Sequence, residues 1–406
     1  MLQEWKPDFL NKLYVYSLCL LVYTAADVSW LFVIPRPPLY FLVSALAIIN
    51  AVKNGVYVTP KKILWILAWF VFNLIIIVFT GSIISQLFRL VYVLIMASVI
   101  LMSLDEMKYL LKILTNCFVF ILVVSIPPWF LYLSGVPLPH TGPHYPNDFH
   151  IYYDYFFFTA DAKVYSSDYN RFSSVFLEPG QMATPCMFLF HLNTKEGKLF
   201  RFKNIVMLVG VIMSYSLVAY GLLVVSLVVN QMQRNRNGIV FVILTISILA
   251  GLSIYFMNNE ENAVNRLIIS RLEYDEEEGN ISGYNRTNED FDIRYNQMMD
   301  TSDKYFGLHE ENLSWTTNTS GYKKFIVHNG IVGFAIVLFM MLILLMDNKK
   351  RSALVYCIMV IVAFLVRDML TTPLWMTCAI IGMYLMGEDK EKVKYTNQAV
   401  TNIEYN

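Results

Sequence analysis

Long apolar runs recur along this chain and limit the folds it can adopt more than any other feature does. Stretches of roughly 18 or more mostly apolar residues are long enough to cross a lipid bilayer as helices. They occur along the whole 406-residue chain, of which 56% is hydrophobic and only 15% charged. The sequence therefore predicts an all-α polytopic membrane protein embedded in a lipid bilayer.

We expect about twelve transmembrane or half-spanning helices, with both chain ends cytoplasmic. The run 205–230 contains S-Y-S near its middle and Gly221, so we interpret it as two short helices that enter the membrane and return. This interpretation keeps every lysine and arginine cluster on the cytoplasmic side, as the positive-inside rule requires. The other candidate spans are 13–34, 38–52, 63–80, 83–102, 109–133, 175–191, 239–256, 325–346, 353–366 and 371–386.

These spans divide the chain into six regions. Membrane helices are expected in residues 1–133, 175–256 and 323–387, and a cytoplasmic tail in 388–406. Two polar regions, 134–174 and 257–322, should lie together on the external side. Because long loops on a rigid scaffold often carry function, we expect the site where these two regions meet.

One stretch at the edge of an apolar run carries a cation and a carboxylate. It begins at Arg171 and reads R-F-S-S-V-F-L-E-P-G-Q-M-A, so Glu178 and Gln181 flank a Pro-Gly pair. Pro and Gly suit the first turn of a helix, whose N–H groups favour phosphate. This stretch could bind an anionic head group. Tyr169 belongs to an aromatic cluster that could stack on sugars, although an interfacial aromatic belt explains it equally well.

Three further arginines are candidates for binding an anion. Arg89 lies within an apolar run, where an arginine is costly and faces the bundle interior or a water-filled cleft, unless it snorkels to the surface. Arg286 and Arg294 are eight residues apart in 282–306, which has helical character, and so share one side of it. With Arg171 they could clamp a diphosphate. The alternative is that each arginine pairs with a neighbouring carboxylate on a solvated face.

Other polar residues carry weaker signals. His309, in H-E-E-N, could act as a base. Arg367 and Asp368 lie near the ends of spans and are best explained by their position at the membrane boundary. The acidic run 272–278 is better explained by solvation than by metal binding. The sequence contains no P-loop, G-x-G-x-x-G, G-x-S-x-G or H-E-x-x-H motif, so nothing suggests nucleotide use. We also expect no metal, no cofactor and no nucleic acid partner.

The motifs resemble those of one bacterial family. The stretch from Arg171 resembles the R-x-x-G-x-F-x-E-P-N-x-x-A element of O-antigen polymerases and O-antigen ligases, with Ser174 for the usual Gly and Gly180 for the usual Asn. G-Y-N-R at 283–286 resembles the family's second arginine element, and 214–221 its serine-bearing hairpin. Phe306-Gly307 followed by G-I-V-G-F at 330–334 resembles its closing G-x-x-G element. The resemblance covers residues 169–339.

The resemblance implies that Arg171 and Arg286 hold undecaprenyl-diphosphate-linked oligosaccharide. Arg89, Arg294, Gln181 and Tyr169 would assist substrate binding, and a chain-length regulator protein would be a further partner. Glu178 would orient Arg171 or accept a proton, with His309 as the second candidate for proton transfer. The ligases carry a histidine before the closing element, whereas residues 315–322 here contain none. That departure favours a polymerase over a ligase.

The expected protein is thus a GT-C-like glycosyltransferase of the bacterial inner membrane. It would polymerise oligosaccharide repeat units of O-antigen or capsule type on the periplasmic side, with arginines stabilising the diphosphate leaving group and without a metal. One alternative is an O-antigen ligase that transfers glycan to lipid A core. The other is a transporter or flippase without chemistry, which would need charge along a route across both leaflets.

Overall fold

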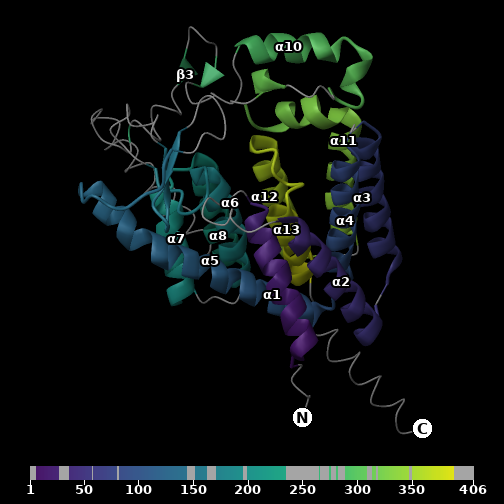
Figure 1. Cartoon of the computed structure of the whole chain (residues 1–406), viewed down its shortest axis with the longest axis horizontal. Coiled ribbons are helices and arrows are strands. Elements are labelled where there is room, and N and C mark those ends of the chain that lie inside the picture. The colour runs from purple at the N-terminus through teal and green to yellow at the C-terminus, as the bar shows by residue number, and fades with distance from the viewer. Residues whose placement is uncertain are drawn as a thin grey trace.

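The long apolar runs form the helices of a bundle (Figure 1). Four helices are long and apolar enough to cross a membrane, namely α3 (Pro60–Phe79), α4 (Ile83–Leu101), α5 (Leu104–Leu133) and α11 (Tyr322–Leu345). The prediction of a helical membrane protein is confirmed at this level. The computed structural model describes residues 6–26, 36–56, 58–79, 82–143, 151–161, 171–194, 199–234, 265, 274–275, 280–281, 289–308, 313–316, 319–346 and 350–387.

Further helices and two small hairpins make up the rest of the described fold. The helices are α1 (Phe9–Thr24), α2 (Arg36–Asn54), α6 (Pro179–Thr194), α7 (Phe202–Met213), α8 (Leu217–Arg234), α10 (Glu289–Met299), α12 (Arg351–Val366) and α13 (Pro373–Gly387). Short 3-10 turns lie at Ser302–Lys304 and Ser314–Thr316. The antiparallel strand pairs are β1 (Tyr152–Asp154) with β2 (Thr159–Asp161), and β3 (Tyr274–Asp275) with β4 (Asn280–Ile281).

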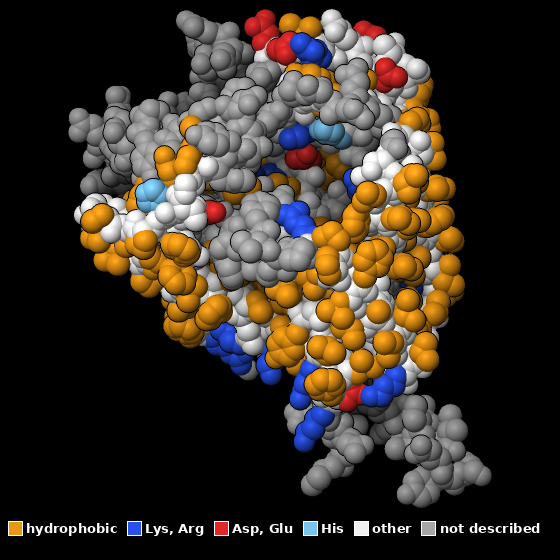
Figure 2. All heavy atoms as spheres, in the orientation of Figure 1, with side chains coloured by type: hydrophobic (Ala, Val, Ile, Leu, Met, Phe, Trp, Pro, Cys, Tyr) orange, Lys and Arg blue, Asp and Glu red, His pale blue; other side chains and the backbone are white. Residues whose placement is uncertain are grey.

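Helix α13 is almost entirely buried and forms the centre of the bundle. It contacts α1, α4, α5, α6, α11 and α12. Its Trp375 packs edge-on against Phe188 of α6 at 5.6 Å between ring centroids. Large apolar side chains such as Ile63 and Phe120 remain exposed on the outer helices, and Figure 2 shows hydrophobic side chains over the sides of the molecule. This distribution is that expected of a bundle surrounded by lipid.

One end of the bundle, here called the basic end, gathers lysines that tie helix ends together. Lys61 donates to the carbonyl of Leu344 at 2.7 Å, which joins the start of α3 to the end of α11. Lys62 donates to the carbonyl of Met102 at 3.3 Å, after the end of α4. Lys53 at the end of α2 pairs with Asp8, the N-cap of α1. The opposite end, here called the α10 end, carries α10 (Figure 1).

Helices α7 and α8 form the predicted two-helix excursion. Arg171 and Phe172 mark the α10 end of α7, because the amide of Phe172 donates to the carbonyl of Met213 at 3.1 Å. The chain reverses at residues 214–216, where Tyr215 has a left-handed φ of 47°. Asn230 near the end of α8 then donates to Thr194 at the end of α6 at 2.7 Å. The pair therefore begins and ends at the basic end, as the S-Y-S interruption predicts.

A separate small core holds α10 against α11. Phe291, Tyr295 and Met298 of α10 pack on Ile326 and Val327 of α11. These contacts place the polar layer of residues 289–308 directly over the first turns of α11 (Figure 1).

Helix α11 is broken within this layer at Gly330, the first glycine of the G-I-V-G-F element. Gly330 has φ 69° and ψ 175°, a region that only glycine adopts readily. The amide of Val332 is thereby free of the helix and donates to the carbonyl of Tyr305 at 3.1 Å. Gly307 has φ 89°, and a Cβ added at this position would lie 2.7 Å from the carbonyl carbon of His328. The two glycine elements of the predicted motif therefore pack backbone to backbone.

Some predicted boundaries differ from those in the structure. Helix α5 begins at Leu104 rather than residue 109, because Ser103 and Glu106 form a capping box that extends the helix into polar residues. The helix expected over 282–306 is α10, Glu289–Met299, followed by a 3-10 turn. The predicted span 239–256 lies outside the described residues.

Candidate functional site

The loop between α12 and α13, residues 367–372, contacts α4 and the segments before α6 and α11 at the α10 end. Tyr92 of α4 donates its hydroxyl to the carbonyl of Thr371 at 2.6 Å. Gly321, which precedes α11, lies so close to the carbonyl of Leu365 that a Cβ there would be 2.9 Å away. Arg367 reaches across to Glu178 before α6. Figure 2 shows a hollow beneath the α10 layer with basic, acidic and histidine side chains inside it.

Arg367 is the buried cation of this site. Its side chain is 8% exposed, and Nη1 donates to Oε2 of Glu178 at 2.5 Å. The Glu178 side chain is 42% exposed, so the pair joins a buried guanidinium to a carboxylate that faces outward. The sequence placed Arg367 near the end of a span, and in the structure it directly follows α12. Glu178, predicted to orient Arg171 or to accept a proton, pairs with Arg367, 189 residues away in sequence.

Gly180 makes room for this guanidinium. A Cβ at position 180 would collide with Nη2, Cζ and Nε of Arg367. The arginine therefore lies flat against the first turn of α6, where the helix dipole is positive and anions are favoured.

Two polar atoms of the site are buried without a hydrogen-bond partner among the described residues. They are Nε of Arg367 and Oε1 of Gln181. A buried polar group without a partner costs about 1–3 kcal/mol, and such groups call for an explanation such as a ligand. Gln181, expected at the site, is thus placed beside it on the first turn of α6.

Arg171 binds backbone carbonyls at the end of α7. Its Nε donates to the carbonyl of Ser214 at 3.2 Å, and Nη2 donates to the carbonyl of Tyr215 at 3.0 Å. These carbonyls end α7, where backbone acceptors lack helical partners and a cation is favourable. Arg171 therefore fixes the α7–α8 reversal against the segment that leads into α6.

The other predicted arginines lie apart from one another. Arg89 is half-buried on α4 and interacts electrostatically with the hydroxyls of Tyr40 and Tyr92. Arg294 lies on the outer layer and pairs with Asp290 at 3.0 Å, with both side chains at least half exposed. It also lies 5.7 Å from the ring centroid of Trp315. Arg294 thus has a neighbouring carboxylate as its partner, as the second alternative predicts. Tyr169, Arg286 and His309 lie outside the described residues.

Asp368, Lys324 and His328 add charge and titratable groups that the sequence analysis did not assign to the site. Burial raises the pKa of the Asp368 carboxyl, while the cations of Lys324 and Arg367 and the Gly321 backbone oppose that rise. Lys324 and His328 are four residues apart on α11 and so lie on one helix face. His328 Nε2 is 3.3 Å from Oγ1 of Thr316. Adjacent charges between two apolar runs are the signal that could have identified Asp368.

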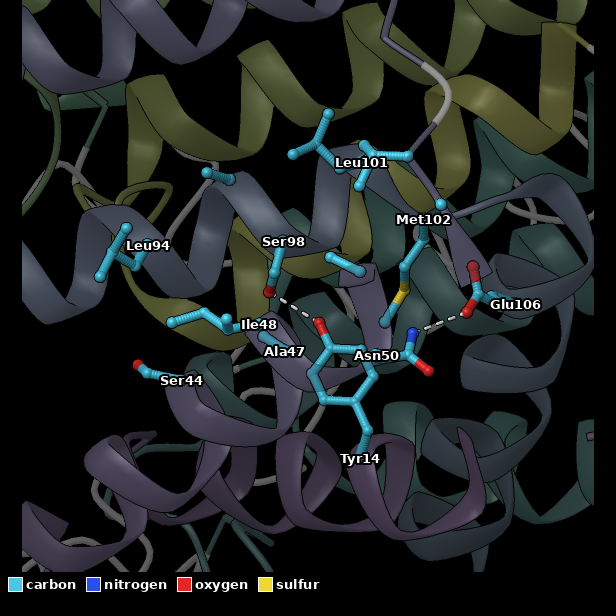
Figure 3. Close-up of a pocket in the computed structure, with 14 residues that line it drawn as sticks. Tyr14, Ser44, Ala47, Ile48, Asn50, Leu94, Ser98, Leu101, Met102 and Glu106 are labelled. Atoms are coloured by element: carbon cyan, nitrogen blue, oxygen red, sulfur yellow. Dashed lines mark hydrogen bonds between the residues drawn. The ribbon is translucent and has the colours of Figure 1, made fainter. Parts of the chain in front are cut away.

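A separate cavity of about 180 Å³ lies near the basic end between α1, α2, α4 and α5 (Figure 3). Tyr14 and Ser98 hydrogen-bond across it at 2.6 Å. Asn50 donates to Glu106 at 2.9 Å, and the same carboxylate accepts from Ser103. These bonds join α1 to α4 and α2 to α5, so most polar groups of this cavity already have structural roles, whereas Oγ of Ser44 is buried without a hydrogen-bond partner among the described residues.

The α10 end could therefore bind an anion through a buried guanidinium at a helix start, with carboxylates beside it for proton transfer. Among the described residues, no group of three or more His, Cys, Asp or Glu side chains is placed to hold a metal ion. Comparisons of the chain with protein-family models, with curated proteins and with solved structures found no match.

Proposed function

We propose that this protein is a membrane glycosyltransferase that polymerises undecaprenyl-diphosphate-linked oligosaccharide repeat units into O-antigen or capsule-type polysaccharide. The observation that carries the proposal is the buried Arg367 against Gly180 and Glu178 of the E-P-G element. This places a fixed cation at the start of a helix, as binding of a diphosphate requires. Arg89 lies on α4, whose Tyr92 contacts the same loop, and would add a second cation.

The proposed setting is the bacterial inner membrane, with about twelve spanning or half-spanning helices in a GT-C-like arrangement. The lysine-rich basic end would face the cytoplasm by the positive-inside rule, and the α10 end would face the periplasm. The partners would be the lipid-linked oligosaccharide and a chain-length regulator protein. The clustering of buried Arg367 and Asp368 at one end favours an enzyme over a flippase.

The proposed reaction is displacement at an anomeric carbon. The hydroxyl oxygen of the incoming unit forms a bond to that carbon as the bond to the diphosphate oxygen breaks. The electron pair of the broken bond stays on the diphosphate, and the hydroxyl proton passes to a carboxylate, for which Glu178 is the nearest candidate. Arg367, with Arg286 as the resemblance implies, would stabilise the leaving charge, each such donor contributing about 3 kcal/mol. This reaction needs no metal, so polymerisation should persist in EDTA, and strict Mg²⁺ dependence would contradict this mechanism.

Surface-glycan banding tests the function directly. Deletion of the gene should leave one repeat unit on the surface and no ladder, and the wild-type gene should restore the ladder. Arg367→Met should fail to restore it. Arg201→Met, at the exposed N-cap of α7 at the basic end, is the matched control and should restore it. Complete loss of surface repeat units on deletion would indicate a ligase or flippase, and an unchanged ladder would refute the proposal.

A further inference from the structure

The two partners of the Glu178–Arg367 pair differ in their freedom to move. The Arg367 side chain is 8% exposed and lies against Gly180, whereas the Glu178 side chain is 42% exposed. Removing a carboxylate from a buried cation is costly unless another anion replaces it. The Glu178 side chain already contacts solvent, whereas the guanidinium cannot leave without losing its packing against Gly180. An arriving anion would therefore displace Glu178 rather than Arg367.

We propose that Arg367 exchanges partners, releasing Glu178 when it binds the diphosphate of the lipid-linked substrate. The exchange deepens the proposed function and rests on it for the step in which Glu178 accepts the proton of the acceptor hydroxyl. The Nε atom of Arg367 is buried beside Gly180, so the exchange takes place at Nη1, the nitrogen that now donates to Glu178. A diphosphate oxygen would take the place of the carboxylate oxygen there, since charge-assisted bonds from a guanidinium to phosphate oxygens are strong.

The exchange couples binding to proton transfer. While Arg367 holds Glu178, one carboxylate oxygen accepts a hydrogen bond from the guanidinium. Once the diphosphate takes the guanidinium, that oxygen is released from Arg367 beside the leaving group. It can then accept the proton of the acceptor hydroxyl as the new bond to the anomeric carbon forms. The base would thus be available only when the donor substrate is bound.

If the exchange occurs, substitutions of Glu178 and of Arg367 should change the affinity for diphosphate in opposite directions. Glu178→Gln removes the competing charge but keeps an oxygen that can accept from Arg367, so diphosphate affinity should rise about tenfold. Arg367→Met should lower the affinity at least tenfold, and Arg367→Lys, which keeps the charge but not the fork, should lie between it and wild type. A purely structural ion pair would lower affinity in both the Glu178→Gln and Arg367→Met variants.

Calorimetric titration of the full-length protein in nanodiscs would measure these affinities, with farnesyl diphosphate and inorganic diphosphate as the probes. Tighter binding of the prenyl compound would identify a lipid source for the diphosphate, and equal binding would indicate the free ion. Gly180→Ala keeps Arg367 but displaces it, so weaker binding is expected in a variant that retains the arginine. Arg201→Met should bind as wild type does.

Loss of affinity in Glu178→Gln, or unchanged affinity in Arg367→Met and Gly180→Ala, would overturn the exchange. Its failure can be told apart from failure of the proposed function. The expected order of affinities with an unchanged surface glycan after gene deletion would refute the function and leave the exchange standing. Loss of the ladder on gene deletion, together with an unchanged diphosphate affinity in Arg367→Met, would refute the exchange and leave the function standing.

Discussion

The carbonyl of Tyr305 lies against Gly330, in the space where any other residue would place its Cβ. This contact locks the polar layer at the α10 end to the break in α11. It also requires a backbone conformation, φ 69° and ψ 175°, that is essentially confined to glycine. Two independent constraints thus act on one residue.

Gly330→Ala should therefore destabilise the protein by several kcal/mol, on the order of 3, since both the backbone strain and the collision with backbone atoms must be relieved. Gly55→Ala is the matched control, because Gly55 has φ 70° but nothing within 4 Å of its Cβ position. It should cost only about 1 kcal/mol. Thermal unfolding in detergent would measure both, and equal losses would contradict the proposed role of the Tyr305 contact.

Gly180→Ala should reduce polymerisation strongly while changing stability little. The added Cβ meets the far end of a flexible arginine side chain, which can move aside at small cost. The ladder assay should show shortened or absent chains at a nearly normal melting temperature. Gly221→Ala, where nothing lies within 4 Å, should leave both unchanged. A large loss of stability in Gly180→Ala would show that the segment, rather than the arginine, needs the glycine.

Arg171→Ala should lower stability as well as activity. The change removes two charge-assisted hydrogen bonds from the end of α7, each worth about 1.5–3 kcal/mol. Arg171→Lys should recover part of the melting temperature, since an ammonium can still reach a helix C-terminus. If Arg171→Ala lost activity at full stability, a direct role at the substrate would replace the structural one.

Arg294→Ala should be nearly silent. Its ion pair with Asp290 is exposed and spans one helical turn, a type of pair that contributes about 0.3–0.5 kcal/mol. The glycan ladder should be normal and the melting temperature within a degree or two of wild type. Loss of the ladder in Arg294→Ala would instead indicate that Arg294 binds substrate, as the sequence suggests.

Asp368 should make stability fall as pH rises. Its pKa is raised in the folded protein by burial, so folding favours the protonated form. That contribution is present below the ordinary pKa of aspartate and is lost as pH rises through the raised value. Asp368→Asn, which stays neutral, should melt higher than wild type at pH 8 and show a smaller difference at pH 4. A lower melting temperature for Asp368→Asn at pH 8 would mean that Lys324 and Arg367 outweigh burial.

The helices could be predicted from sequence because a chain in lipid must satisfy its own backbone groups, so length and hydropathy suffice. The chain reversal at 214–216 and the special glycine at 330 could also be predicted, because each depends on a short local stretch of sequence. The pairing of Glu178 with Arg367 could not, because 189 residues separate the two. Arg171 was identified, but its partners are backbone carbonyls, which leave no trace in side-chain identity.

The return of α7 and α8 to the basic end has a consequence for how the chain enters the membrane. Helix α7 has 12 residues, about 18 Å at 1.5 Å per residue, well short of a hydrocarbon core of about 30 Å. A nascent α7 could not be released into lipid by itself. We therefore expect α7 and α8 to enter the lipid together as one hairpin, after both have been synthesised.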